Sequence, residues 1–139
     1  MIELDNRTTL EVDEPLLNSI ANTLTDKEIE LIITTNAEIA EINKIHRNIN
    51  KPTDVLSFPY EEMPMSPLGS IVVSKEFIID KAKELGHTNS NEMTLLFIHG
   101  LLHLLGYDHE VDSGEMRTKE ECMIKEFSLP TSLIVRTQG

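Results

Sequence analysis

Apolar side chains recur at helical spacing along much of the chain. The strongest segment covers residues 93–105, which are almost all apolar and are followed by Gly106, a residue that favours helix termination. Asn89 and Glu92, just before it, have the spacing of a capping box. Four more helices are predicted: one capped by Asp13, one capped by Asn36 that ends before Pro52, one from Ser74 to Gly86, and one over residues 113–127.

Short apolar runs between these helices predict the strands. They cover residues 2–4, 28–34, 55–58 and 70–73, and Pro59 ends the third run. About four short strands with about five helices are typical of an α+β fold. We therefore expect a small mixed sheet covered by helices, with the helix of residues 93–105 at its centre.

Length and composition indicate one globular domain over residues 1–139. Hydrophobic residues make up 40% of the chain and charged residues 26%, which excludes wholesale disorder. No run approaches the ~18–20 apolar residues of a membrane span, and residues 1–5 do not resemble the start of a signal peptide. Cys122 is the single cysteine, so no intramolecular disulfide can form. We expect a cytoplasmic protein without membrane contact, with Cys122 as a small buried hydrophobe.

The net charge of −12 argues against non-specific binding of nucleic acid. The distribution is uneven, however, because residues 42–53 contain no acid and include Lys44, Arg47 and Lys51. A local positive strip on an acidic body can receive a phosphate. The same cations can also be the solvated end of a helix, where they interact favourably with the helix dipole. Charge alone leaves both interpretations open.

Three of the five histidines lie within eleven residues, at the end of the strongest predicted helix. His99 and His103 are four residues apart, so their rings share one helix face and can reach one metal ion. A continuing helix would carry His109 away from them. Gly106 permits a left-handed turn that brings His109 back. The spacing predicts one Zn²⁺ per chain held by three histidines, with an open fourth position as in catalytic sites. Hydrogen bonds alone could also satisfy these rings.

The run His-Gly-Leu-Leu-His-Leu-Leu-Gly-Tyr-Asp-His over residues 99–109 resembles the signature of the YbeY family of bacterial single-domain endoribonucleases. Residues 51–59 and 68–74 are similar to two further landmarks of that family. The resemblance implies an α+β fold, cleavage of single-stranded RNA in ribosomal RNA maturation and ribosome quality control, and contact with the ribosomal subunit. It also implies zinc ligation by His99, His103 and His109, and an arginine, Arg47, on the phosphate near the metal. The family usually has Asp where this chain has Ser70.

Two other functions compete with RNA cleavage. The histidine spacing also matches the HExxHxxGxxH pattern of metzincin proteases, but Gly100 stands where that pattern has its catalytic glutamate. The chain could instead be a ribosome-assembly or RNA-binding factor whose zinc is mainly structural. Around the site, we expect His87 to form a hydrogen bond, and Thr53 and Asp54 to brace the loop before residue 55.

Overall fold

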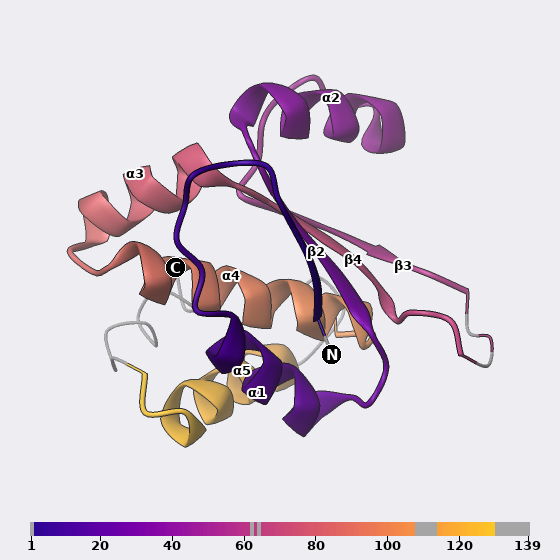
Figure 1. Ribbon diagram of the computed structural model, residues 1–139, viewed down its shortest axis with the longest axis vertical. Coiled ribbons are helices and arrows are strands. Elements are labelled where there is room, and N and C mark those ends of the chain that lie inside the picture. Colours follow the sequence, from indigo (N-terminus) through magenta and orange to yellow (C-terminus); the bar gives the residue numbers. More distant parts are fainter. Residues whose placement is uncertain (1, 62, 64, 108–113, 130–139) are drawn as a thin grey trace.

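Four strands form one mixed sheet in the order β1-β2-β4-β3 (Figure 1). The computed structural model describes residues 2–61, 63, 65–107 and 114–129. The elements are β1 (Ile2–Asn6), α1 (Glu14–Leu24), β2 (Ile29–Thr34), α2 (Asn36–Arg47), β3 (Val55–Pro59), β4 (Gly69–Ser74), α3 (Lys75–Leu85), α4 (Asn89–Leu104) and α5 (Glu115–Glu126). Over the described residues, the predicted α+β class, the four strands and the five helices are confirmed.

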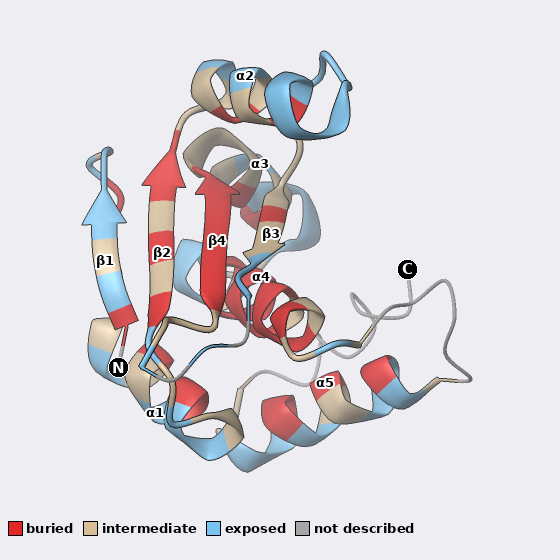
Figure 2. Cartoon of the chain, turned by 90° about the vertical axis from the view of Figure 1, so that its right-hand side faces the viewer, coloured by how far each residue is buried: buried red, intermediate tan, exposed pale blue. Residues whose placement is uncertain are grey.

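β1, β2 and β4 are parallel, and β3 runs antiparallel to β4 at the edge of the sheet. β4 is buried along its whole length and β2 over most of it (Figure 2). Strands covered on both faces read as nearly continuous apolar runs, which is why these two were visible in the sequence. Helices supply the cover on each face.

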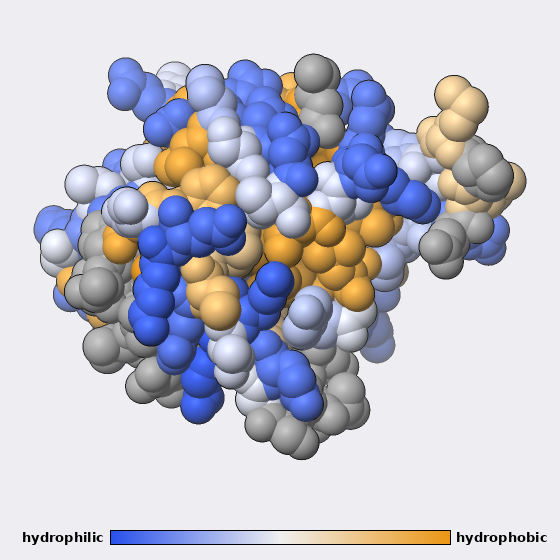
Figure 3. Space-filling model, turned by 90° about the horizontal axis from the view of Figure 1, so that it is seen from below, coloured by the Kyte–Doolittle hydropathy of each residue, from blue (hydrophilic) through white to orange (hydrophobic). Residues whose placement is uncertain are grey.

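α2 packs on one face of the sheet, and the other helices lie mainly on the opposite side (Figure 1). Ile39 of α2 packs with Leu56 of β3 and Val72 of β4 in a small separate cluster. The main core lies on the other face, where buried α4 side chains share one cluster with those of β2 and β4 and contact α1, α3 and α5. The outer surface of α1 and α5 mixes charged side chains with apolar patches (Figure 3). No described helix has both the length and the apolar character of a membrane span.

Gly100 allows α4 to lie close against the sheet. A Cβ at this position would be 3.0 Å from Cγ2 of Ile71 and 3.1 Å from Oγ of Ser57, closer than about nine in ten real Cβ contacts. The Ser57 hydroxyl donates a hydrogen bond of 3.1 Å to the Gly100 carbonyl. The close approach places the C-terminal half of α4 beside β3.

Two predicted helix caps are displaced by one residue. Thr35 caps α2, with its hydroxyl accepting from the Glu38 N–H, because Oδ1 of Asn36 instead accepts from the Ser74 hydroxyl. Thr88 caps α4 in the same way, accepting from the Asn91 N–H at 3.0 Å. The cap predicted at Asp13 is confirmed, since Oδ1 of Asp13 accepts from the Leu16 N–H.

The proposed capping box at the start of α4 does not form, because Glu92 is engaged elsewhere. Its Oε1 lies 2.9 Å from Nε2 of His87, and both side chains are buried. The expectation that His87 forms a hydrogen bond is confirmed. Cys122 was expected to be buried and is exposed. The inner face of α5 is formed instead by Met116, Glu120, Met123 and Ile124.

Candidate functional site

A cavity of about 590 Å³ lies between the C-terminal ends of α2 and α4 and the edge strand β3. It is lined by residues 54–59 together with Arg47, His99, His103, Gly106 and Tyr107. The structure therefore brings Arg47 to the same cavity as two of the three predicted metal ligands. His109, the third, lies outside the described residues.

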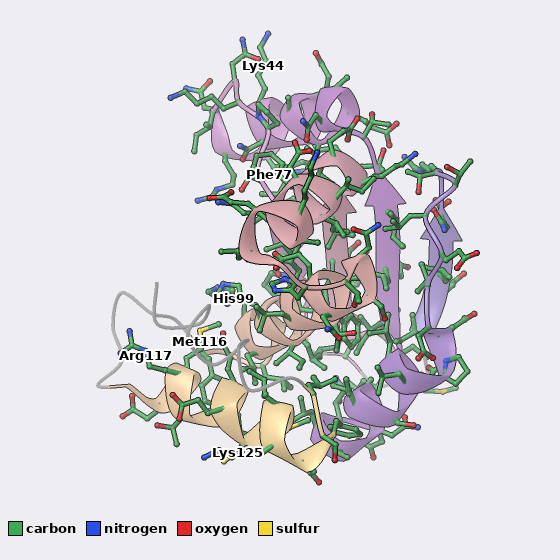
Figure 4. All side chains as sticks on the ribbon, turned by 90° about the vertical axis from the view of Figure 1, so that its left-hand side faces the viewer. Lys44, Phe77, His99, Met116, Arg117 and Lys125 are labelled. Atoms are coloured by element: carbon green, nitrogen blue, oxygen red, sulfur yellow. The ribbon has the colours of Figure 1, made fainter. Side chains whose placement is uncertain are left out.

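His99 and His103 direct their Nε2 atoms toward one another. The two nitrogens are 3.1 Å apart, and the rings are nearly perpendicular, with their centroids 4.7 Å apart. His99 leaves α4 on the side where Met116 of α5 lies (Figure 4). The four-residue spacing thus places both rings on one helix face, as the sequence analysis expected.

The other nitrogen of each ring is held by a hydrogen-bond acceptor. Nδ1 of His103 is 3.0 Å from the carbonyl oxygen of Tyr107, and Nδ1 of His99 is 2.7 Å from Oε1 of Glu120. A carbonyl oxygen can only accept, so Nδ1 of His103 carries its proton. A carboxylate fixes the same tautomer in His99. In two neutral rings, both Nε2 lone pairs then face each other, an arrangement that a shared proton or a metal ion stabilises.

The spacing of the two Nε2 atoms fits a single zinc ion. Zinc binds histidine nitrogen at ~2.0–2.1 Å, so nitrogens 3.1 Å apart subtend about 100° at the metal, close to the tetrahedral ~109°. An acceptor on the far side of each ring is the usual support of a metal-binding histidine. Within the described residues, no three histidine, cysteine, aspartate or glutamate side chains gather as a metal site.

The chain turns sharply at the end of α4. Gly106 has φ +101°, in the left-handed region that favours glycine. The Gly106 N–H donates to the His103 carbonyl at 3.1 Å, and the Tyr107 N–H donates to the Leu102 carbonyl at 3.0 Å. This turn sets the Tyr107 carbonyl against Nδ1 of His103. The predicted left-handed glycine is therefore confirmed, and the turn also orients the second histidine.

Glu120 and Tyr107 were not predicted from the sequence as site residues. Glu120 is only 2% exposed, and it lies on the buried face of α5, one turn after Met116. An acidic residue in register with an apolar helix stripe was a usable signal, because buried carboxylates need a partner. Tyr107 contributes its main-chain carbonyl, for which side-chain identity gives no signal.

Arg47 is the member of the positive strip that lines the cavity. Lys44 lies at the α2 end of the molecule, away from His99, which lies near its middle (Figure 4). Lys44, His46 and Arg47 all occupy the last turn of α2, where cations favour the helix dipole. His46 is exposed, and its ring centroid lies 4.9 Å from that of Phe58. The helix-dipole interpretation therefore fits the last turn of α2, and phosphate binding by Arg47 stays a prediction.

The contacts of Asp54 and Ser70 support the local structure. Oδ1 of Asp54 accepts from the Val55 N–H at 2.8 Å and from the Thr53 hydroxyl at 3.3 Å, as expected for a brace. Ser70 is buried in β4 and pairs in register with Phe58, and it does not line the cavity. Nearby, a hydrogen bond to Glu30 raises the pKa of Tyr60. The position where the family usually has Asp is thus separate from the histidine pair.

Comparisons with known proteins agree with this architecture. The family model described as Endoribonuclease YbeY matches residues 3–128. A curated relative named Endoribonuclease YbeY from Sulfurimonas denitrificans is 63% identical over 139 residues, covering 100% of both chains. One of the same name from Aliarcobacter butzleri is 61% identical, covering 98% of this chain and 99% of the relative. A solution structure of a Thermotoga maritima protein aligns with a TM-score of 0.63 and 29% identity, covering 91% of this chain and 89% of that one. The chain belongs to the YbeY family of endoribonucleases.

Proposed function

We propose that this protein is a zinc-dependent endoribonuclease that cleaves single-stranded RNA in ribosomal RNA maturation and ribosome quality control. One observation carries the proposal: two histidines with facing Nε2 atoms share a cavity with an arginine. Family membership supports RNA as the substrate. We place the reaction in the cytoplasm, where ribosomal subunits are the partner and an exposed thiol such as Cys122 stays reduced.

His99, His103 and His109 would hold the metal. Imidazole nitrogens suit Zn²⁺, and the Nδ1 contacts with Glu120 and Tyr107 keep the two described rings in the ligating tautomer. When bound, Zn²⁺ supplies a Lewis acid that polarises a phosphoryl oxygen and acidifies an attacking hydroxyl or water.

Arg47 would bind the scissile phosphate from the opposite side of the cavity. Its guanidinium offers a planar pair of N–H donors that matches two phosphate oxygens. Because negative charge builds on those oxygens during cleavage, the contact strengthens in the transition state.

The metalloprotease alternative lacks its base for a structural reason. Position 100 faces Ile71 and Ser57 of the sheet, which would have to shift by a few tenths of an ångström to admit even a Cβ. This chain therefore lacks the glutamate of the protease pattern, and a larger side chain at position 100 would require the sheet side chains to shift. The assembly-factor alternative differs from the enzyme in one respect: its zinc supports binding without cleavage.

The test compares zinc content and RNA cleavage in the same preparations. His103→Ala is expected to lose stoichiometric zinc and cleavage together. Arg47→Ala is expected to keep its zinc and lose ~10²–10³-fold in cleavage rate, the usual cost of one contact to a developing oxyanion. Full zinc occupancy in His103→Ala would refute the ligand set. RNA binding without cleavage in the zinc-loaded wild type would favour the assembly factor.

A further inference from the structure

The open edge of β3 runs through the middle of the cavity. β3 is the last strand in the order β1-β2-β4-β3, and over the described residues only β4 pairs with it (Figure 2). Leu56 packs toward α2, whereas the Ser57 hydroxyl bonds to α4. Arg47 lines the cavity from the α2 side, and the histidine pair lines it from the α4 side. A ligand that contacts both must cross the edge of β3.

Hydrogen bonds at the two ends of the β3–β4 ladder show which main-chain groups face this edge. The Ser74 N–H donates to the Asp54 carbonyl, and the Tyr60 N–H donates to the Leu68 carbonyl, each at 3.1 Å. Successive residues of an antiparallel strand direct their N–H and C=O groups to opposite edges. Residues 54, 56, 58 and 60 therefore bond toward β4. The N–H and carbonyl of Ser57 therefore point together away from β4, toward the open edge, and Ser57 lines the cavity.

Among the residues of β3 that face the open edge, Ser57 is the one whose main-chain N–H is left for a ligand. The Val55 N–H donates to Oδ1 of Asp54 at 2.8 Å, and Pro59 has no N–H. An added polypeptide strand needs donors at successive alternate residues, so this short, proline-ended edge suits it poorly. One donor beside one acceptor instead matches the Watson–Crick edge of an unpaired nucleobase, which carries adjacent acceptor and donor groups.

We propose that the Ser57 main chain binds a nucleobase of the RNA substrate next to the scissile phosphate. The Ser57 N–H donates to a ring nitrogen or carbonyl oxygen of the base, and the Ser57 carbonyl accepts from an amino or ring N–H. The cavity, about 590 Å³, is in the size range of sites that hold a small ligand. Arg47 on the same cavity supplies charge for the adjoining phosphate. The assignment rests on the proposed RNA cleavage.

The contact is tested by removing the N–H of residue 57. Ser57→Pro removes it, and proline is tolerated at an edge strand where the N–H points away from the ladder. Ser57→Ala is the reference, because both variants lack the hydroxyl. Fluorescence anisotropy of the zinc-loaded proteins with a short single-stranded RNA is expected to show about 2- to 10-fold weaker binding by Ser57→Pro than by Ser57→Ala, with equal zinc content.

RNA strands with one abasic nucleotide, moved stepwise along the sequence, identify the contact as a base contact. At the position of the bound base, the two variants are expected to bind equally. A difference that persists with every abasic strand would assign the N–H to the RNA backbone and overturn the proposal. RNA binding that is equally tight in Ser57→Pro and Ser57→Ala would also overturn the proposal. This includes a result in which Ser57→Pro loses affinity for an extended peptide but not for RNA.

Two measurements keep the outcome interpretable. If Ser57→Pro does not fold, an amide-to-ester replacement at position 57 removes the same N–H without constraining φ, and the same binding comparison decides. Cleavage is followed separately on each sample. Wild-type protein that binds RNA without cleaving it would reject the proposed enzyme, while the abasic comparison would still accept or reject the base contact.

Discussion

Replacing Glu120 tests whether the site is built to hold a metal. The Glu120 carboxylate is 2% exposed and accepts from Nδ1 of His99 at 2.7 Å, while the His99 side chain is 28% exposed. Glu120→Ala removes the acceptor that fixes the His99 tautomer and ring orientation. Loss of such an outer partner typically weakens metal binding ~10–100-fold, or about 1.4–2.7 kcal/mol. That range agrees with the ~1.5–3 kcal/mol of a hydrogen bond to a charged group.

The assay is competition for zinc with a chromophoric chelator, alongside thermal unfolding of each metal-free protein. Glu120→Gln keeps the shape and one acceptor oxygen, so we expect its zinc affinity to lie between those of the wild type and Glu120→Ala. Glu126→Gln is the matched control, because Glu126 is an exposed acid on the same helix. Wild-type zinc affinity in a folded Glu120→Ala protein would refute the reasoning. Equal losses of zinc affinity in the Glu120 and Glu126 variants would show that the effect comes from the change in net charge alone.

Three further substitutions test the cavity and the turn. Arg47→Lys should restore little of the cleavage lost in Arg47→Ala, since an ammonium lacks the planar pair of donors; recovery to near the wild-type rate would show that charge alone suffices. Gly106→Val should cost ~1–2 kcal/mol at φ +101° and weaken zinc binding, and an unchanged chelator titration would contradict this. Gly100→Ala should destabilise the protein by ~1–3 kcal/mol, because its Cβ would lie 3.0 Å from Ile71; urea unfolding checks this, and wild-type stability would show that α4 shifts freely.

The sequence alone was sufficient for the elements and for the histidine pair. β2 and β4 are covered on both faces, so their buried positions appear as apolar runs. The relation of His99 to His103 is set by helix geometry, which depends on nothing outside α4. The left-handed turn at Gly106 is likewise a local property of the backbone. The histidine spacing and the glycine turn are each decided by neighbours in the chain.

Tertiary structure decided what surrounds that pair. Glu120 reaches His99 across 21 residues because α5 packs its inner face against α4, and Arg47 joins the cavity because α2 ends beside β3. The shift of the α2 cap to Thr35 has the same origin, since Ser74 engages the residue that local preference chose. Local propensities differ by fractions of a kcal/mol to about 1 kcal/mol, so a single contact between distant segments can outweigh them. The sequence therefore determined that His99 and His103 share one helix face, and packing decided how they are oriented and what they face.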